Sequence, residues 1–505
     1  MARADSESFH DWLRHRAFSN PDRLALITGN IQLSFAALDQ HVDQAADWLA
    51  GQGVSQGAHI ALHLPNSLAF VELVHAISRI GAVLVPINLR LTPDEIAWQL
   101  SDVEASMLIT SDPADDLRSA IVERVPGTRI HAIDPHNPDF RAISHDRSPV
   151  FHYYHDARDI HAIVYTSGTT GRPKGALLTY GNHWWSAIGS GLNLGIHTND
   201  RWMAVLPLFH VGGLSILMRS VIYGITVVVH ETFDPAKVNE SIERDRVTII
   251  SVVSTMLRRM LVDQEASQYP DWLRCVLLGG GPAPRPLLEE CARRNVPVTQ
   301  TYGLTESASQ IATLPPDEAL LKLGSAGKPL YPNELAISSD DRWAAPGEPG
   351  EIVVRGPIIT AGYYGRPDAT SSAFRDGWFH TGDAGYLDQD GYLYVLDRRD
   401  DLIVTGGENV YPAEVEAVLS GHPDIVEAGI VGIADEEWGQ RVVGLITCTD
   451  ESRLEPNAIR SWCREFLAGY KAPVELRFTS RPLPRNAGGK LLRRQIRSNW
   501  GQQQI

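Results

Sequence analysis

The sequence predicts an α/β fold, with a large N-terminal domain of layered α/β sheets and a small α+β C-terminal domain. Strand-like apolar runs alternate with helical patterns through about the first 330 residues. After that point the chain changes to short strands and turns, which predicts a β-barrel-like part of the large domain. A separate strand and helix unit follows near residue 400. We therefore expect an N-terminal domain over residues 1–399 and a C-terminal domain over residues 400–505.

The first half supplies the elements of the layered sheets. The segment "SFAALDQHVDQAADWLAGQG" predicts a helix whose apolar face carries Phe35, Leu38, Val42 and Leu49. "LTPDEIAWQL" predicts another helix, with Thr92 as its N-cap and Pro93 in its first turn. Strands are predicted for "HIALHL", "ASMLIT", "RWMAVLPL", "TVVVH", "VTIISVV" and "RCVLLGGG". Ligands of such sheets bind at the carboxyl ends of the strands, so the loops after these runs are the candidate site.

The part after residue 330 reads as hairpins followed by a compact unit. Asp390-Gly391 stands between two aromatic-rich strands, which is a hairpin signal. In "GGENVYPAEVEAVLSGHPDI", Pro412 opens a helix and Gly421 ends it. We expect the small domain to contain this helix and the strands around it.

Composition and charge limit the classes of function. A hydrophobic content of 43% and a charged content of 21% are typical of a globular protein. A formal charge of -16 argues against a general nucleic-acid or anionic-membrane surface. The most apolar stretch, 68–87, carries Glu72, His75 and Arg79, so it predicts a buried helix and a strand, not a membrane span. The N-terminal residues show no apolar core of a signal peptide, and we expect a cytoplasmic protein.

The cysteines give no sign of a metal site or a disulfide framework. There are four of them in 505 residues, and their spacing fits no zinc motif. They are Cys275, Cys291, Cys448 and Cys463. We expect buried or inert thiols.

One loop carries the strongest chemical signal in the chain. "YTSGTTGRPKG", residues 165–175, follows an apolar strand and combines small hydroxyl residues, glycines and Lys174. Glycine lets backbone N–H groups approach an anion closely, so the loop predicts a cradle for phosphates. A solvated surface loop is the alternative on composition alone. Lys174 follows Pro173 and precedes Gly175, which excludes the G-x-x-x-x-G-K-[ST] motif, so any bound ATP lies in another fold.

Further glycine- and acid-bearing turns follow in a fixed order. They are "LLGGGPAP" (277–284), "QTYGLTES" (300–307), "HTGDAGYL" (380–387), "DRRDDLIVTGGENVYP" (397–412) and "LPRNAGGK" (483–490). Each alone is weak evidence, because a Gly-Asp turn is often purely structural. Together with the phosphate loop, the set resembles the acyl-adenylate-forming superfamily of acyl-CoA synthetases, luciferases and adenylation domains. The resemblance covers essentially the whole chain.

This resemblance implies ATP as a substrate and Mg²⁺ as its companion ion. The residues it assigns to ATP are Thr166, Ser167, Gly168, Thr169, Thr170, Lys174, Gly280, Gly281, Pro282, Tyr302, Gly303, Thr305, Asp383 and Arg398. Glu306, with Thr166, would hold Mg²⁺, and Asp383 would accept both ribose hydroxyls. Lys490 would bridge the carboxylate and the α-phosphate, and it forms the expected catalytic set with Glu306 and His210.

The resemblance also implies coenzyme A as the acceptor and a mobile C-terminal domain. Family members rotate this domain between the two half-reactions, and Asp400 matches the hinge. The expected CoA contacts are Arg90, Gly406, Gly407, Asn409, Trp438 and Lys471. One position departs from the pattern, because Ala472 stands where an arginine is expected, which leaves Lys471 as the candidate.

The acid that is activated is indicated by the segment "FHVGGLSILMRSVIYG". His210 matches the gate between the acyl site and the CoA tunnel. Arg219 lies in an otherwise apolar run; such an arginine usually reaches to the surface, but beside an acyl site it predicts a substrate with a second negative charge. Gly279 and Ser307 are the other expected acyl contacts. Here the chain resembles the 2-succinylbenzoate–CoA ligases of menaquinone biosynthesis, which implies the dianion o-succinylbenzoate as substrate.

Other functions stay open at this stage. Within the fold, the alternative is a ligase for another aryl or short aliphatic acid. Light emission, an adenylate-binding protein without activity and a ligase that loads a carrier protein are the other classes. The presence of Lys174, Glu306, Asp383 and Lys490 argues against an inactive protein. The resemblance further implies a homodimer or a homotetramer, with small molecules and no nucleic acid as partners.

Overall fold

The computed structural model describes residues 7–111, 115–140, 151–166, 172–264, 268–280, 283, 285–339, 342–397, 403–410, 412–420, 422, 424–448, 454–484, 491 and 493–500. Contacts divide the chain into two compact units. The first contains Met1–Leu89, Leu100–Tyr165 and Gly175–Leu396, and the second contains Arg90–Gln99, Thr166–Lys174 and Asp397–Ile505.

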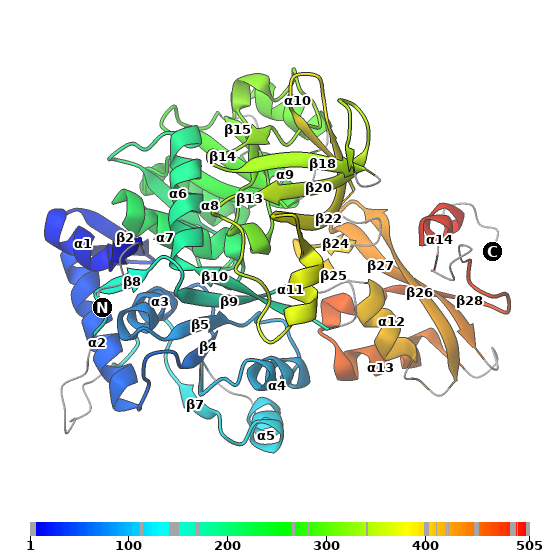
Figure 1. The fold of residues 1–505 in the computed structure, drawn as a ribbon, viewed down its shortest axis with the longest axis horizontal. Helices are drawn as coiled ribbons and strands as arrows, with labels where there is room; N and C mark the ends of the chain where they lie inside the picture. The colour runs from blue at the N-terminus through cyan, green and yellow to red at the C-terminus, as the bar shows by residue number, and fades with distance from the viewer. Residues whose placement is uncertain are drawn as a thin grey trace. The chain divides into compact units, whose positions relative to one another are not determined.

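Two sheets form most of the first unit (Figure 1). One has six strands, in the order β10 (Lys174–Thr179), β9 (Ile160–Thr166), β5 (Val83–Pro86), β4 (His59–His63), β6 (Met107–Thr110) and β7 (Arg129–Ala132). The other has nine, in the order β17 (Lys328–Pro329), β16 (Ala312–Leu314), β15 (Val298–Tyr302), β14 (Cys275–Gly279), β13 (Ile249–Val253), β11 (Arg201–Ala204), β12 (Thr226–Val229), β2 (Leu24–Thr28) and β3 (Ile31–Ser34). The central strands of both sheets pair in parallel, as expected for strands joined through helices.

Helices connect the strands of these sheets. They are α1 (Trp12–Ser19), α2 (Phe35–Gly51), α3 (Leu68–Ile80), α4 (Pro93–Asp102), α5 (Asp115–Arg124), α6 (Tyr180–Leu194), α7 (Val211–Tyr223), α8 (Pro235–Arg244), α9 (Ser254–Asp263) and α10 (Arg285–Arg293). Their ends follow local capping chemistry. The hydroxyl of Ser67 accepts a hydrogen bond from the Phe70 N–H at the start of α3, and Gly81 ends that helix at φ +74°.

Helices α2, α3, α6 and α7 share one hydrophobic core with both sheets. The core joins residues of α2 and α3, such as Phe35 and Phe70, to residues of β4, β11 and β12, such as Ile60 and Trp202. Helix α6 packs against α7, and α2 packs against α3 (Figure 1). The opposite face of the nine-stranded sheet is covered by α8, α9 and α10. This arrangement is the layered α/β architecture that the sequence predicts.

The rest of the first unit is an antiparallel sheet. Its strands are β19 (Arg342–Trp343), β18 (Glu334–Ser339), β20 (Gly350–Arg355), β22 (Trp378–Leu387), β21 (Phe374–Arg375) and β23 (Leu393–Asp397), with α11 (Pro367–Ala373) before β21. The predicted hairpin at Asp390-Gly391 is confirmed: it joins β22 to β23, with Gly391 at φ +80°. A short pair, β1 (Ser8–His10) and β8 (Tyr154–Asp156), and the 3-10 turns η1 (Thr305–Ser307) and η2 (Pro316–Glu318) complete this unit.

The second unit contains a five-stranded sheet with helices beside it. Its strands are β25 (Glu408–Val410), β24 (Ile403–Thr405), β27 (Gly439–Cys448), β26 (Ile425–Asp435) and β28 (Glu475–Thr479). The helices after residue 400 are α12 (Pro412–Ser420), α13 (Pro456–Phe466) and α14 (Arg493–Trp500), with the 3-10 turn η4 (Gly469–Lys471). Apolar residues of β24, β26 and β27 and of α12 and α13 form its core. The predicted α+β class is confirmed here.

The predicted N-cap of α4 is also confirmed. Thr92 and Glu95 cap α4 reciprocally: the Glu95 N–H donates to the Thr92 hydroxyl, and the Thr92 N–H donates to the Glu95 carboxylate. Cys275, Cys291 and Cys463 are buried free thiols, and Cys448 is partly exposed. No helix in the described part of the chain is both long enough and apolar enough to cross a membrane. The domain boundary at residue 400 stays a prediction, because residues 398–402 lie outside the described ranges.

Candidate active site

The ends of the phosphate loop are held by two strands. Thr166 ends β9 and Lys174 begins β10, and the Thr166 hydroxyl donates a long hydrogen bond of 3.5 Å to the Lys174 carbonyl oxygen. The loop therefore runs from strand to strand, whereas a P-loop of nucleotide kinases runs from strand to helix. Four predicted ATP contacts, Ser167, Gly168, Thr169 and Thr170, lie outside the described residues.

Strands β14 and β15 end side by side and carry predicted ATP and acyl contacts. They pair in parallel, so Gly279 and Tyr302, their last residues, lie at the same edge of the sheet. Gly280 follows at φ +82°, a conformation that favours glycine, and a Cβ there would lie 3.0 Å from Val253. Gly281 and Pro282, the next two predicted contacts, are outside the described residues.

Tyr302 and Asp383 are brought together although they are far apart in the chain. Asp383 is buried in β22, with 6% of its surface exposed, and its carboxylate accepts a 2.7 Å hydrogen bond from the Tyr302 hydroxyl. Its backbone N–H donates to the Thr381 hydroxyl. A fixed carboxylate beside an aromatic ring suits the ribose and base of a nucleotide. Arg398, the other predicted ribose contact, is outside the described part of the chain.

A tight turn after β15 presents Glu306. A Cβ at Gly303 would lie 1.5 Å from the Ser309 carbonyl oxygen, so only glycine fits there. Thr305 opens η1, and the Ser307 hydroxyl accepts from the Leu304 N–H at 2.9 Å. The Glu306 carboxylate accepts a 2.9 Å hydrogen bond from the Tyr363 hydroxyl. The turn and Tyr363 together fix the direction of this carboxylate.

The donor set around Glu306 fits Mg²⁺ that arrives with a nucleotide. Among the described residues, no three His, Cys, Asp or Glu side chains gather to hold a metal ion. Mg²⁺ is usually held by one or two carboxylates together with substrate phosphates and water, and not by a cage of protein ligands. A single oriented carboxylate such as Glu306 is what this mode of binding requires.

Two of the predicted acyl contacts, His210 and Arg219, belong to α7 and its N-terminal cap. His210 precedes the helix as its N-cap residue, and its ring lies 4.5 Å from that of Phe209. Gly213 permits the turn before it, because a Cβ there would lie 2.3 Å from the Pro207 carbonyl oxygen. Arg219 lies further along α7 and has only 2% of its surface exposed. The alternative that Arg219 reaches the surface is thus excluded.

Arg219 is a buried cation without a counter-ion in the described part of the chain. Its Nη2 donates to the Ser186 hydroxyl at 3.2 Å, and its guanidinium carbon lies 5.4 Å from the centre of the Trp202 ring. No described carboxylate pairs with it, and its buried Nε has no hydrogen-bond partner. Burial therefore lowers the pKa of Arg219. A carboxylate of a substrate would relieve this cost.

The histidines beside Arg219 are held neutral. The Nδ1 of His161 lies 3.1 Å from the Nε2 of His183, and both rings are buried. Burial, together with the nearby Arg219 cation, lowers the pKa of His183 to about 3. Burial and His183 lower the pKa of His161 well below its usual value. At neutral pH the positive charge in this region is that of Arg219.

Within the second unit, Gly406, Gly407 and Trp438 lie together. Gly406 and Gly407 form the turn between β24 and β25, at φ +58° and +82°. A Cβ at Gly406 would lie 2.8 Å from the ring of Trp438, which is 51% exposed. Asn409 lies on β25 opposite Val404, and its side chain is outside the described atoms.

The two basic residues predicted to contact CoA are engaged with carboxylates of the same unit. Arg90 lies 3.4 Å from Glu408, and its guanidinium stands over the ring of Tyr470. Lys471 is buried, with its ammonium 2.8 Å from Glu95 and 2.9 Å from Glu414. Burial lowers the pKa of Lys471, but these two carboxylates outweigh burial and raise it overall.

Sequence reasoning missed the partners of the predicted residues. Tyr363 beside Glu306, Ser186 beside Arg219 and Glu95 beside Lys471 carry no local motif of their own. Only the composition of "GYYG" offered a hint, since a tyrosine in a glycine-rich turn often has a specific contact. Lys490 and Asp400, the predicted catalytic lysine and hinge, lie outside the described residues.

Two protein-family models and several relatives match this chain. The family model of the AMP-binding enzyme matches residues 13–364, and that of the AMP-binding enzyme C-terminal domain matches residues 414–490. A 2-succinylbenzoate–CoA ligase of Geobacillus sp. (strain WCH70) is 50% identical over 490 residues, which is 97% of each chain. A 2-succinylbenzoate–CoA ligase of Bacillus cytotoxicus is 45% identical, over 97% of this chain and 98% of the relative.

Solved structures of the same kind are similar along the whole chain. A double mutant of o-succinylbenzoate CoA synthetase from Bacillus subtilis, bound with the product analogue OSB-NCoA, has a TM-score of 0.90 and 42% identity. That match covers 97% of this chain and 99% of the other. The Bacillus subtilis synthetase in complex with ATP and magnesium ion has a TM-score of 0.73 and 42% identity, over 97% and 100% of the chains.

Proposed function

The chain belongs to the family of AMP-binding enzymes, and from this premise we propose that it joins o-succinylbenzoate to coenzyme A in menaquinone biosynthesis. The reaction consumes ATP, proceeds through an acyl-adenylate, and releases pyrophosphate and AMP. The main support for this acid is the burial of Arg219, a cation that no described carboxylate neutralises. A monoanionic acid would leave this charge unpaired after its only carboxylate is activated.

In the first half-reaction, a succinyl carboxylate oxygen attacks the α-phosphorus of ATP and pyrophosphate leaves. Thr166, Lys174 and the loop between them hold the leaving phosphates, because backbone N–H groups and an ammonium neutralise developing charge. Asp383 accepts the ribose hydroxyls, and Tyr302 borders the base. We assign to Lys490 the role of bridging the carboxylate and the α-phosphate, which would lower the repulsion between the two anions.

Glu306 is the residue that would hold Mg²⁺, together with Thr166. The ion supplies charge neutralisation at the phosphate oxygens. The hydrogen bond from the Tyr363 hydroxyl keeps the Glu306 carboxylate in one orientation, and the turn at Gly303 fixes its backbone. These contacts support the assignment of Glu306.

Recognition of the acid rests on α7 and the strands beside it. Arg219 pairs with the ring carboxylate, since a guanidinium suits a planar carboxylate in bidentate fashion. Gly279 and Ser307 provide small walls for the aromatic ring, and His210 closes the acyl site toward coenzyme A. His183, neutral because its pKa is about 3, adds no competing charge.

In the second half-reaction, the CoA sulfur attacks the acyl carbonyl carbon and AMP leaves. We assign the pantetheine path to Gly406, Gly407, Asn409 and Trp438, and the rotation that exposes it to a hinge at Asp400. Arg90 is the candidate for the nucleotide end of coenzyme A. Lys471 as a CoA contact requires its ion pair with Glu95 and Glu414 to open, because its ammonium is buried between them.

Location and assembly are part of the same proposal. We propose the cytoplasm as the location, because the proposed reaction consumes ATP and coenzyme A. A homodimer or a homotetramer is the assembly that the family resemblance implies.

The experiment that tests the function is a substrate panel. Pyrophosphate release is measured with o-succinylbenzoate, benzoates and short and long aliphatic acids, with and without coenzyme A, and the thioester is identified by mass. We expect rapid turnover with o-succinylbenzoate and a CoA thioester as product. Faster turnover with a benzoate or an aliphatic acid would contradict o-succinylbenzoate as the substrate but would support the ligase reaction. Acyl transfer to a carrier protein but not to coenzyme A would show that coenzyme A is not the acceptor.

A further inference from the structure

We propose that Ser186 is a positioning residue that orients Arg219 toward the ring carboxylate of the acid and links this cation to the turn that carries Glu306. The inference rests on the proposed function, because it takes the second carboxylate of the substrate as the partner of Arg219. It extends that function, since it names the group that makes the enzyme selective for a dianion.

The geometry around Ser186 gives its hydroxyl two roles at once. Ser186 lies in the middle of α6 and is 4% exposed. Its Oγ accepts the hydrogen bond from the Arg219 Nη2 at 3.2 Å and donates to the Ala308 carbonyl oxygen at 2.8 Å. A serine hydroxyl has one donor and two acceptor lone pairs, so both bonds form together. Helix α6 packs along α7 (Figure 1), and the hydrogen bond shows that Ser186 and Arg219 meet between the two helices.

Two contacts fix the guanidinium and leave its Nε donor unsatisfied. The Trp202 ring covers it from one side, and Trp202 is itself held by a 3.0 Å hydrogen bond from its Nε1 to the Ser251 hydroxyl. Ser186 anchors Nη2, while Nε is buried and has no hydrogen-bond partner. An anchored plane with an unsatisfied donor is prepared for an anion, because little side-chain freedom is left to lose on binding.

The second bond of Ser186 reaches the turn of the predicted magnesium ligand. Ala308 directly follows η1, and it is held at φ +50°. The same turn is fixed by the bond from the Thr360 N–H to the Glu306 carbonyl oxygen at 2.7 Å. Ser186 therefore joins the cation for the acid to the carboxylate for Mg²⁺ through one hydroxyl group.

The test compares two acids on one variant. Ser186→Ala is assayed with o-succinylbenzoate and with 4-oxo-4-phenylbutanoate, which lacks the ring carboxylate. A hydrogen bond to a charged group corresponds to a change of about 10-fold to 100-fold in equilibrium constant. We expect kcat/KM for o-succinylbenzoate to fall by about that factor, mainly through KM, while kcat/KM for the monoanion stays unchanged.

Two further variants separate positioning from packing. Ser220→Ala is the matched control, because Ser220 is a buried serine next to Arg219 whose hydroxyl donates only within α7, to Leu217 at 2.8 Å. Ser220→Ala should leave the ratio of kcat/KM for the two acids unchanged. Ser186→Thr retains the hydroxyl and should restore the ratio. If Ser186→Ala does not fold, Ser186→Cys, which is close in shape and a weak hydrogen-bond former, is compared with Ser186→Thr instead.

The outcomes distinguish this inference from the function beneath it. An equal loss with both acids in Ser186→Ala would assign Ser186 to packing and overturn the inference, with the function intact. An unchanged ratio of kcat/KM for the two acids in Ser186→Ala would also overturn the inference. If the unaltered enzyme does not prefer o-succinylbenzoate over 4-oxo-4-phenylbutanoate, the pairing of Arg219 with the ring carboxylate fails, and the role of Ser186 fails with it.

Discussion

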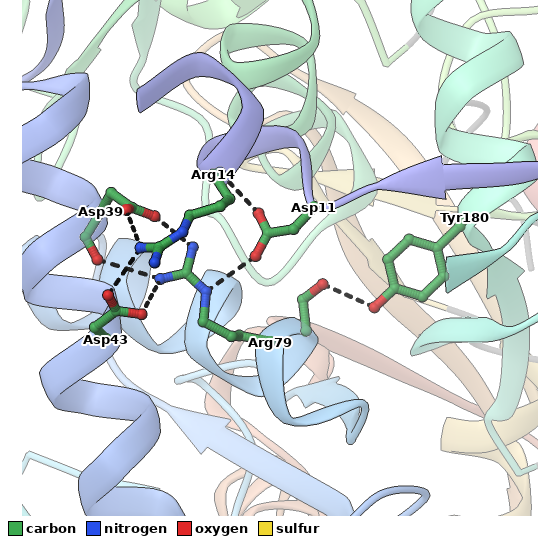
Figure 2. Close-up of polar contacts among 7 residues, drawn as sticks. Asp11, Arg14, Asp39, Asp43, Arg79 and Tyr180 are labelled. Atoms are coloured by element: carbon green, nitrogen blue, oxygen red, sulfur yellow. Dashed lines mark hydrogen bonds and ion pairs between the residues drawn. The ribbon is translucent and has the colours of Figure 1, made fainter. Parts of the chain in front are cut away.

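Two arginines of the first unit are equally buried, yet their surroundings differ completely. Arg79, in the last turn of α3, contacts Asp11 at 3.0 Å, Asp39 at 2.6 Å and Asp43 at 2.7 Å (Figure 2). Arg219, in α7, has a serine and a tryptophan ring but no described carboxylate. A protein that can surround one buried cation with three carboxylates leaves the other uncompensated. We infer that the first completes the fold and the second awaits a ligand.

The pKa shifts of these two groups have opposite signs. Burial lowers the pKa of both guanidinium groups. At Arg79 the aspartates outweigh burial and raise the pKa, whereas at Arg219 burial prevails and the pKa is lowered. Figure 2 shows how the paired cluster is assembled, with Asp11 at the start of α1, Asp39 and Asp43 on α2, and Arg79 on α3. Mutation of each arginine should therefore act on a different property.

The largest effect is expected for Arg79→Met. It leaves Asp11 buried without its cation and Asp39 with only the partly exposed Arg14, and removal of one partner of a buried ion pair costs about 3–5 kcal/mol. We expect a lower midpoint in thermal and urea unfolding, with an unchanged KM for o-succinylbenzoate in the folded protein. If unfolding of Arg79→Met occurs at the midpoint of the unaltered protein, the cluster is not structural and the contrast with Arg219 is lost.

Arg219→Leu should give the reverse pattern. Loss of a buried, hydrogen-bonded charge partner costs about 2–5 kcal/mol in binding, so we expect KM for o-succinylbenzoate to rise by about 30-fold or more. The unfolding midpoint should stay equal or increase, because an unpaired buried charge is removed. Steady-state kinetics and thermal unfolding on the same preparation measure both, with KM for ATP as the internal control. An unchanged KM for the acid would refute the assignment of Arg219.

These two arginines also show which features of the protein can be predicted from its sequence and which cannot. Periodicity predicts α2, α3 and the parallel strands, because local apolar spacing determines which face is buried. Motifs predict Glu306, Asp383 and the ends of the phosphate loop, because close backbone approach requires glycine at fixed places. Neither signal reveals whether a buried arginine has a counter-ion.

The contact partners of the site residues cannot be predicted from the sequence, because tertiary packing determines which residues meet. Ser186 precedes Arg219 by 33 residues and Ala308 by 122, and Glu95 precedes Lys471 by 376. Asp11 and Asp39 carry no motif that marks them as partners of Arg79. Since each contact depends on which helices pack together, no local pattern encodes it. The sequence therefore gave candidates for the site, and packing decides which of them are paired.

A neutral histidine, His155, adjoins the paired cluster and makes the stability of this region depend on pH. His155 stacks on Tyr180, and burial lowers its pKa to about 4; Asp11 and Asp159 raise it, and His152 lowers it further. A folded-state pKa below the usual 6.5 means that stability is full above about pH 6.5 and falls as the pH decreases toward 4, since the unfolded chain binds the proton first.

His155→Phe should remove this part of the acid sensitivity. The Nε2 of His155 has no hydrogen-bond partner, so a phenyl ring keeps the stacking and loses little. We expect the variant to be more stable than the unaltered protein by about 2 kcal/mol at pH 5 and equal to it at pH 7.5. Unfolding midpoints measured across this range give the answer. Parallel curves for the two proteins would show that His155 does not titrate as its burial requires.

The smallest effect is expected at the exposed edge of the paired cluster. Arg14 contacts Asp39 and Asp43, the same carboxylates as Arg79, but its side chain is 38% exposed. An exposed ion pair contributes about 0.2–1 kcal/mol, because water solvates both charges when the pair is broken. Arg14→Met should therefore lower the unfolding midpoint far less than Arg79→Met, and salt should reduce the difference further. Equal losses in the two variants would mean that burial does not set the strength of this cluster, and the unpaired state of Arg219 would then no longer distinguish it as a ligand site.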